Sequence, residues 1–306
     1  MCPAARAPRT PIESRCVPLR LSCGVLVQSA LLGLRLVSTV ALCCCAWAAS
    51  RLYTALGGRS RPRIVPAFRR GVRIISGCLL GSFGFRLRIV GQENVPADYE
   101  STRYVLVSNH VTVYDVWAIM STVGPVSFVS KQAIFNFPIL GTVLTALEAI
   151  GVDRSKSNAA ARQAIDDRVT KGIFPPCVFP EGSTTNGYGV VDFKEGAFAP
   201  GARVLPIALE YSCPSGFDLS YTSNQMSSGA VLQHFFRTLV EPYKTVTVRV
   251  LPAVEPDAAM RKDAGLYARH VRGLIASALP HQHKWDGWDS QRMRTVWFDK
   301  DVSKLD

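Results

Sequence analysis

The chain has 306 residues, of which 48% are hydrophobic and 19% are charged, and its mean hydropathy is +0.14. This apolar content is high for a soluble enzyme and low for a polytopic membrane protein, and the length fits one sizeable domain with an appendage. The formal net charge of +12 is uneven, because residues 1–90 carry fourteen Arg and no Lys against a single acid, Glu13, whereas the remainder is close to neutral.

The basic N-terminal segment indicates a partner with negative charge. Arg-rich segments can bind nucleic acid, but here the arginines flank apolar stretches, which favours the anionic head groups of lipids. We therefore expect a membrane bilayer as a partner and no nucleic acid.

The nine cysteines match neither the spacing of a metal site nor a disulfide framework, so no metal is expected. Cys43, Cys44 and Cys45 stand in a row within apolar sequence. Near a membrane they could be palmitoylated, or they could serve as small apolar fillers.

Residues 1–90 are predicted to form a basic, apolar membrane-anchoring region. Leu21–Leu34 and Leu36–Ala49 are almost wholly apolar and are separated by Arg35. Each is shorter than the ~20 residues that span a bilayer. Two interpretations stay open: one span that tolerates Arg35 at mid-membrane for about 2.5–3.5 kcal/mol, or a helical hairpin that enters one leaflet with Arg35 at its turn. A cleaved secretory signal and a mitochondrial transit peptide fit the pattern less well.

A third apolar segment, Ile74–Phe85, has arginines on both sides. It is too short to cross a bilayer, so it is predicted to be a helix at the membrane interface.

The next segment joins a strand to a helix through a polar turn. Arg103–Val107 is β-branched and apolar, which predicts a buried strand that ends at Ser108 and Asn109. The apolar spacing of Val113, Val116, Trp117 and Met120 predicts a following helix. His110 and Asp115 then lie at the carboxyl end of a strand, where open α/β sheets bind ligands. A base next to a carboxylate is the arrangement that deprotonates a hydroxyl.

A second turn of this kind comes about seventy residues later. Cys177–Phe179 predicts a short apolar strand, and Pro180, Glu181 and Gly182 a turn after it. The hydroxyl and amide side chains that follow are Ser183, Thr184, Thr185 and Asn186.

The remaining elements complete an alternating pattern. Strands are predicted over Val126–Val129, Val204–Tyr211 and Val246–Leu251, and helices over Ala159–Lys171, capped by Ser157, and over Ala258–Leu279. Alternation of this kind predicts an α/β fold with a mainly parallel sheet flanked by helices. The predicted domain covers residues 91–280, and residues 281–306 form a polar tail whose tryptophans pack on the domain.

These motifs, in this order and spacing, resemble those of the glycerophospholipid acyltransferases. The four blocks are Asn109-His110 with Asp115; Asp153 and Arg154; Phe179-Pro180-Glu181-Gly182; and a strand that contains Pro206. The run from Glu181 through Tyr211 is closest to the lysophosphatidylcholine and lysophosphatidylethanolamine acyltransferase branch. Two positions depart from the family: Gly151-Val152 replace an aromatic residue before block two, and Ser183 replaces a common Thr. The calcium-loop pattern of some branch members is absent, so calcium control is not expected.

The resemblance implies a role for each block. His110 would be the catalytic base and Asp115 would orient it, while Asn109, Arg154, Glu181, Gly182, Ser183 and Lys194 would contact substrate. Arg154 would bind the acceptor phosphate, Glu181 the glycerol part, and backbone N–H groups near Gly182 the oxyanion. Phe179, Pro180 and Pro206 would shape the motifs.

The implied activity is esterification of a lysophospholipid hydroxyl, on lysophosphatidylcholine or lysophosphatidylethanolamine, with acyl-CoA as co-substrate and with no metal or other cofactor. The endoplasmic reticulum is the expected membrane, with Golgi or mitochondria as alternatives. Rival functions are a lysophosphatidate acyltransferase, a CoA-independent transacylase, an acyl-CoA thioesterase and an inactive membrane scaffold.

Overall fold

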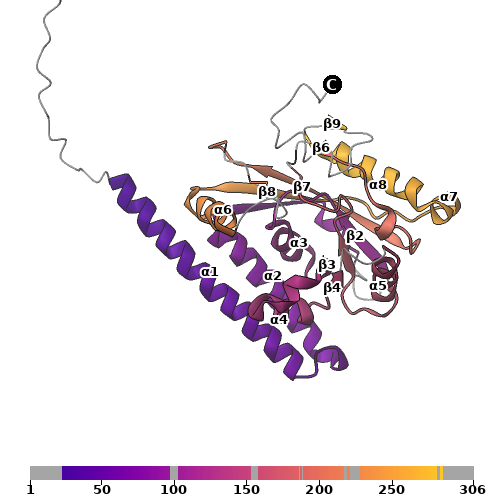
Figure 1. The fold of residues 1–306 in the computed structure, drawn as a ribbon, viewed down its shortest axis with the longest axis horizontal. Coiled ribbons are helices and arrows are strands. Elements are labelled where there is room, and N and C mark those ends of the chain that lie inside the picture. The colour runs from indigo at the N-terminus through magenta and orange to yellow at the C-terminus, as the bar shows by residue number, and fades with distance from the viewer. Residues whose placement is uncertain are drawn as a thin grey trace, which may run out of the picture.

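The computed structural model describes residues 23–96, 103–152, 158–185, 187, 189–216, 219–220, 228–280 and 283–284. They form three layers, with a central sheet between two sets of helices (Figure 1). One set consists of α1 (Cys23–Ala55), α2 (Val65–Ser82), α3 (Asp115–Val123), α4 (Pro138–Ala146) and α6 (Ser228–Val240). The other set consists of α5 (Asn158–Lys171), α7 (Ala258–Lys262) and α8 (Ala264–Ala278).

The central sheet has seven strands in the order β1-β8-β7-β2-β5-β3-β4. Their bounds are β1 (Phe85–Val90), β2 (Tyr104–Ser108), β3 (Ser127–Lys131), β4 (Ile150–Val152), β5 (Pro176–Val178), β7 (Arg203–Ser212) and β8 (Lys244–Val250). Neighbours are parallel throughout, except that β7 and β8 are antiparallel. The predicted α/β fold with a mainly parallel sheet is confirmed. A small parallel pair, β6 (Gly189–Val190) with β9 (His283–Lys284), lies beside it.

The strands β2 and β7 lie at the centre of the sheet because their apolar runs supply side chains to both faces. Alternate residues of β2 point to opposite sides, so Leu106 packs with the α2–α3 side while Val105 and Val107 pack with the α5–α8 side. This explains why these strands are continuous apolar runs, as is typical of a sheet covered on both faces.

The helix α1 is continuous through Arg35, so of the two interpretations left open by the sequence, the hairpin with its turn at Arg35 is wrong. The Arg35 side chain is 7% exposed and reaches the carboxyl end of α6. Its guanidinium donates to the carbonyls of Leu239 at 2.7 Å, Glu241 at 2.6 Å and Pro242 at 2.5 Å. These carbonyls satisfy its charge, and this is why an arginine is tolerated in an apolar helix.

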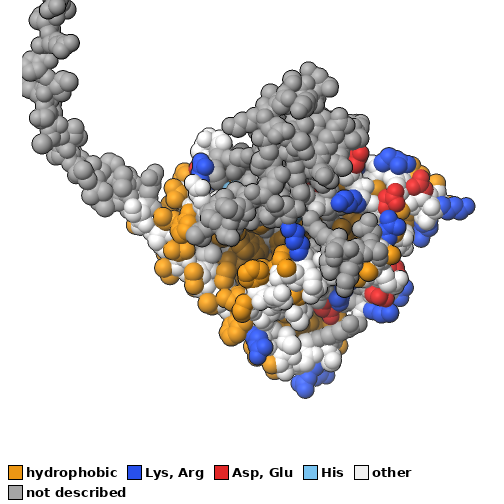
Figure 2. Space-filling view, viewed as in Figure 1, with side chains coloured by type: hydrophobic (Ala, Val, Ile, Leu, Met, Phe, Trp, Pro, Cys, Tyr) orange, Lys and Arg blue, Asp and Glu red, His pale blue; other side chains and the backbone are white. Residues whose placement is uncertain are grey.

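The outward side of α1 is apolar and exposed. Within α1, Ser29–Ala55 is long and apolar enough to cross a membrane, and only 6% of its most apolar window is buried. Figure 2 shows hydrophobic side chains gathered along the edge that α1 forms, whereas charged side chains gather on the opposite side, near α7 and α8. The helix is therefore suited to membrane association.

Three predicted boundaries differ from the structure. The segment Ile74–Phe85 is not one element, because α2 ends at Ser82 and β1 begins at Phe85. Since β1 pairs with β8, the sheet begins before the predicted domain start at residue 91. The predicted helix Ala258–Leu279 is divided by Asp263, whose carboxylate accepts the Leu266 N–H and begins a new helix. The tail beyond residue 284, with its tryptophans, lies outside the described residues.

Candidate active site

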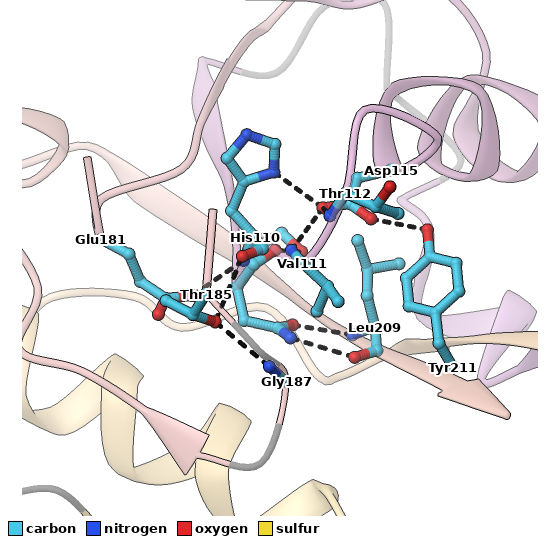
Figure 3. Close-up of polar contacts among 11 residues, drawn as sticks. His110, Val111, Thr112, Asp115, Glu181, Thr185, Gly187, Leu209 and Tyr211 are labelled. Carbon is cyan, nitrogen blue, oxygen red and sulfur yellow. Dashed lines mark hydrogen bonds and ion pairs between the residues drawn. The ribbon is translucent and has the colours of Figure 1, made fainter. Parts of the chain in front are cut away.

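The His110 and Asp115 side chains meet at the carboxyl end of β2. The strand ends at Ser108, His110 lies in the loop that follows, and Asp115 is the first residue of α3. The distance between His110 Nδ1 and Asp115 Oδ2 is 2.7 Å (Figure 3). The loop folds back over the helix start because the same oxygen also accepts the N–H groups of Val111 at 2.7 Å and Thr112 at 3.1 Å.

The ring of His110 packs against an aromatic side chain on one face and is partly exposed to solvent. It stacks on Phe179, with 4.0 Å between ring centroids and 12° between planes, and Phe179 in turn stacks on Phe128. The side chain is 20% exposed, whereas that of Asp115 is fully buried. A histidine that donates Nδ1–H to a carboxylate keeps the lone pair on its other nitrogen, which points away from Asp115 (Figure 3). The arrangement suits a general base.

Tyr211 is a member of the site that sequence reasoning missed. It lies on β7, and its hydroxyl donates to Asp115 Oδ1 at 2.5 Å. Since β7 runs parallel to β2, the carboxyl ends of both strands reach the same edge of the sheet. The sequence shows a tyrosine at the end of an apolar strand, but this pattern does not predict that the tyrosine contacts Asp115.

Asn109 is predicted to contact substrate, and the structure places its side chain on the backbone of β7. Its Nδ2 donates to the Leu209 carbonyl at 3.0 Å, and its Oδ1 accepts the Leu209 N–H at 2.8 Å. The side chain is buried and both ends of its amide are used. Asn109 therefore fixes the loop that carries His110, and direct substrate contact stays a prediction.

Glu181 is also predicted to contact substrate, and it too is buried, at 1% exposure. Its carboxylate accepts the N–H of His110 at 2.8 Å and that of Val191 at 3.4 Å. Burial raises the pKa of the Glu181 carboxyl to about 8; these two backbone donors oppose the rise, and the nearby charge of Asp115 adds to it. Glu181 thus joins two loops around His110, while its contact with glycerol stays a prediction.

The turn after β5 places the remaining residues of the third motif. Gly182 adopts a φ of +73°, the left-handed region that suits glycine, and its N–H donates to the Phe179 carbonyl at 3.0 Å. That N–H is therefore not free for an oxyanion in this arrangement. The Pro180 carbonyl accepts the Lys194 N–H at 2.9 Å, and the exposed Lys194 side chain lies over Gly182. Thr185 donates its N–H to the His110 carbonyl at 2.7 Å, which ties this turn to the base.

The other predicted site residues lie further from this contact. Pro206 is in β7, opposite Val107 of β2, and its carbonyl accepts the Leu251 N–H at 3.0 Å. Ser183 is half-buried beside Gly182. Arg154 and Asn186 lie outside the described residues. Within the part of the chain that the structure describes, no three His, Cys, Asp or Glu side chains form a group that could hold a metal.

The hydrogen-bonded histidine and aspartate at the carboxyl edge of a mainly parallel α/β sheet form an arrangement that can deprotonate a hydroxyl. Residues 86–210 match the family model described as Acyltransferase.

Several relatives that it matches are named as lysophospholipid acyltransferases or lysophosphatidylcholine acyltransferases. The chain is similar to lysophosphatidylcholine acyltransferase of Drosophila melanogaster, at 28% identity over 81% of this chain and 47% of that protein. It is also similar to lysophosphatidylcholine acyltransferase 1 of Homo sapiens, at 29% over 85% and 50%. Lysophospholipid acyltransferase LPEAT1 of Arabidopsis thaliana is 33% identical over 56% of this chain and 44% of its own length. The expected likeness to this branch is confirmed, and the chain spans about half the length of these relatives.

Among solved structures, the chain is similar to the 1-acyl-sn-glycerophosphate (LPA) acyltransferase PlsC from Thermotoga maritima. The identity is 16%, the TM-score is 0.46, and the match covers 78% of this chain and 97% of that one.

Proposed function

We propose that this protein is a lysophospholipid acyltransferase that esterifies the free hydroxyl of lysophosphatidylcholine or lysophosphatidylethanolamine, with acyl-CoA as the donor. The observation that carries the proposal is the 2.7 Å hydrogen bond between His110 Nδ1 and Asp115 Oδ2, with the second ring nitrogen pointing away from Asp115. The names of the matched relatives support the choice of acceptor.

In the proposed reaction, the free nitrogen of His110 takes the proton of the lysophospholipid hydroxyl. The oxygen then attacks the thioester carbonyl, a new C–O bond forms, and the C–S bond to CoA breaks. The proton held by His110 passes to the departing thiolate. Asp115 keeps the imidazole oriented and stabilises its protonated form. Acyl-CoA enters as a co-substrate, and the steps need neither a metal nor a resident cofactor.

The acyl chain needs an apolar space beside this site. A cavity of about 320 Å³ lies between α1, α2, α3 and α4, and Trp117 and Met120 of α3 line it together with Tyr53 and Phe68. Asp115 begins the helix that carries Trp117 and Met120. We propose that this cavity receives acyl chain, with Arg154 and Lys194 binding phosphate groups of the acceptor or of CoA.

The helix α1 gives the proposed membrane contact. It touches the domain at Arg35 and again at Tyr53, which stacks on Phe68 of α2. Eighteen residues of helix between these points span about 27 Å, so α1 lies along the domain. We propose that its exposed side enters one leaflet of the endoplasmic reticulum membrane, with Golgi or mitochondrial membranes as alternatives. Exposed arginines in its last turns and in the segment that follows it, Arg51, Arg61 and Arg63, would face anionic head groups.

The test is CoA release from oleoyl-CoA by membranes that carry the full chain, with lysophosphatidylcholine, lysophosphatidylethanolamine or lysophosphatidate added singly. We expect release that requires one of the first two lipids and that falls about 10²–10⁴-fold in His110→Ala, the usual contribution of a general base. The control is His270→Ala, which removes an exposed histidine on α8 and should leave the rate unchanged.

Each other outcome identifies a rival. Release without any lysolipid indicates a thioesterase, and release that requires lysophosphatidate indicates the other acceptor. Transfer between phospholipids without CoA indicates a transacylase. A folded wild type with no transfer under any of these conditions indicates a scaffold and refutes the proposal.

A further inference from the structure

The two oxygens of the Asp115 carboxylate are used unequally. Oδ2 accepts from His110 and from two backbone N–H groups. Oδ1 accepts from the hydroxyl of Tyr211 at 2.5 Å, which is the sole hydrogen bond to this oxygen within the described residues. Because the carboxylate is fully buried, the oxygen that faces away from His110 depends on this one side chain.

Tyr211 is held firmly by its strand. It lies two residues after Leu209, whose backbone pairs with the Asn109 side chain, so both contacts come from the carboxyl-terminal half of β7, beside β2. The ring meets Phe85 of β1 edge-on, with 6.0 Å between centroids and 77° between planes. One strand therefore fixes both the start of the His110 loop and the donor to Asp115.

We propose that Tyr211 is a positioning residue for acyl transfer: its phenol holds the plane of the Asp115 carboxylate and draws negative charge away from the oxygen that faces His110. This inference rests on the proposed function. Tyr211 of β7 is then a third member of the site, beside His110 and Asp115. Through Asp115, it affects the strength of His110 as a base.

The phenol remains a donor throughout the working range. Burial, and next to it the charge of Asp115, raise the pKa of the Tyr211 hydroxyl well above its ordinary value, so it stays protonated. Among the described residues, Cys177 and Glu181 also interact electrostatically with Asp115, and Tyr114 interacts with Tyr211. Burial also raises the pKa of the Cys177 thiol, so the thiol stays neutral. Burial raises the pKa of the Glu181 carboxyl to about 8, so its ionisation would affect the alkaline limb of a rate profile, and the comparison of variants uses the acid limb.

Removing the hydroxyl has a defined consequence for the base. In Tyr211→Phe the Oδ1 atom is buried without its donor, so negative charge concentrates on Oδ2 and the protonated form of His110 becomes more stable. A larger fraction of His110 is then protonated at low pH and cannot act as a base. The plane of the Asp115 carboxylate is also no longer held, so the imidazole is less well oriented and we expect kcat to fall about ten- to a hundredfold. The acid limb should move to higher pH.

The experiment compares wild type, Tyr211→Phe and Tyr267→Phe as full chains in the same membranes. Tyr267 is a matched control, because it is a buried tyrosine whose hydroxyl donates to the Ala202 and Val254 carbonyls on the other side of the sheet. The rate of CoA release is measured against pH. The ring signals of the histidines are followed by NMR titration, with His110→Gln to assign the signal of His110.

The expected result is that Tyr211→Phe lowers kcat with little change in KM and moves both the acid limb and the His110 titration to higher pH. Tyr267→Phe should leave both midpoints in place. The inference is overturned if Tyr211→Phe keeps the wild-type midpoints, even where its rate or stability is lower. If the wild type transfers no acyl group, the proposed function fails, and the NMR titration alone still decides whether Tyr211 acts on His110 through Asp115.

Discussion

At the scale of the residue, the site is organised by two buried carboxylates with different environments. Asp115 accepts four donors, namely His110, Tyr211 and the N–H groups of Val111 and Thr112. Glu181 accepts two backbone N–H groups, those of His110 and Val191, and burial raises the pKa of its carboxyl to about 8. Donors stabilise the charged form of a carboxylate, and burial disfavours it. Asp115 is therefore suited to hold a charge opposite His110, and Glu181 to connect loops.

The raised pKa of Glu181 predicts how stability depends on pH. The ordinary pKa of this carboxyl is 4.5, so between pH 4.5 and about 8 the folded state binds more protons than the unfolded state. The stabilisation is complete below 4.5 and is lost as the pH rises through about 8. Glu181→Gln removes the titration, while the amide oxygen still accepts the His110 N–H. We expect the melting temperature of this variant to vary less with pH across that range than that of the wild type.

Thermal unfolding of the detergent-solubilised chain at a series of pH values measures this effect. The control is Glu255→Gln, because Glu255 is exposed and should leave the pH dependence unchanged. An equal pH dependence in wild type and Glu181→Gln would contradict the expectation.

At the scale of the element, the carboxyl end of α6 carries two cations. Arg35 donates to the Leu239, Glu241 and Pro242 carbonyls, and Lys244 Nζ donates to the Thr238 carbonyl at 2.6 Å. Burial first, and then the charge of Arg35, lower the pKa of Lys244 to about 8. The last carbonyls of a helix have no partner within it and carry partial negative charge. The carbonyls at the end of α6 therefore bind Arg35, the charged residue in the apolar part of α1.

This contact predicts that Arg35 holds α1 on the domain. Arg35→Met keeps the apolar length of the side chain and removes the donor to three carbonyls, of which that of Glu241 keeps a hydrogen bond from Lys244 at 3.3 Å. A buried group left without a donor costs about 1–3 kcal/mol. We expect a lower melting temperature and faster proteolysis between α1 and α2. Arg51→Met, an exposed position on the same helix, is the control.

Gly84→Ala should also disturb the Arg35 contact and so lower the melting temperature and speed proteolysis between α1 and α2. A Cβ at this position would clash with the Arg35 guanidinium, and the φ of +79° disfavours other residues. Equal melting temperatures and equal rates of proteolysis in Arg35→Met and Arg51→Met would show that the contact of Arg35 with the end of α6 does not hold α1 on the domain.

At the scale of the whole molecule, apolar and charged surfaces lie on opposite sides (Figure 2). Leu34, Val37 and Val40 project from α1 with 67%, 68% and 56% of their surface exposed. Near the start of α4, Phe137 and Leu140 are also exposed. Apolar surface of this kind marks a contact with membrane or protein, and the length and hydropathy of α1 favour membrane.

Membrane binding should therefore depend on the outward side of α1. Replacing Leu34, Val37 and Val40 together by Ser removes side chains that each contribute up to about 1.5–3 kcal/mol when buried. We expect sedimentation with phosphatidylcholine vesicles to fall at least about tenfold, while the fold is kept. Leu266→Ser with Leu274→Ser, two exposed leucines of α8 on the opposite side, is the control. Unchanged vesicle binding in the α1 variant would argue for another membrane-facing surface.

The sequence alone determined the features that depend on near neighbours in the chain. Apolar runs specified β2, β5, β7 and β8 to within about two residues, and the helical spacing after His110 placed Asp115 in the first turn of α3. The loop geometry that lets residues five apart meet follows from a strand that turns directly into a helix. These features are local, so patterns of hydrophobicity and turn residues predict them.

Only the tertiary structure decided the partners that lie far away in the chain. Tyr211 is 96 residues from Asp115, Glu181 is 71 residues from His110, and Arg35 is 204 residues from the Leu239 carbonyl that it binds. Each contact exists because the strand order puts β7 and β5 on either side of β2, and because α1 packs across to the end of α6. Neither strand order nor helix docking leaves a local pattern, so the residue types alone could not show which atoms would meet.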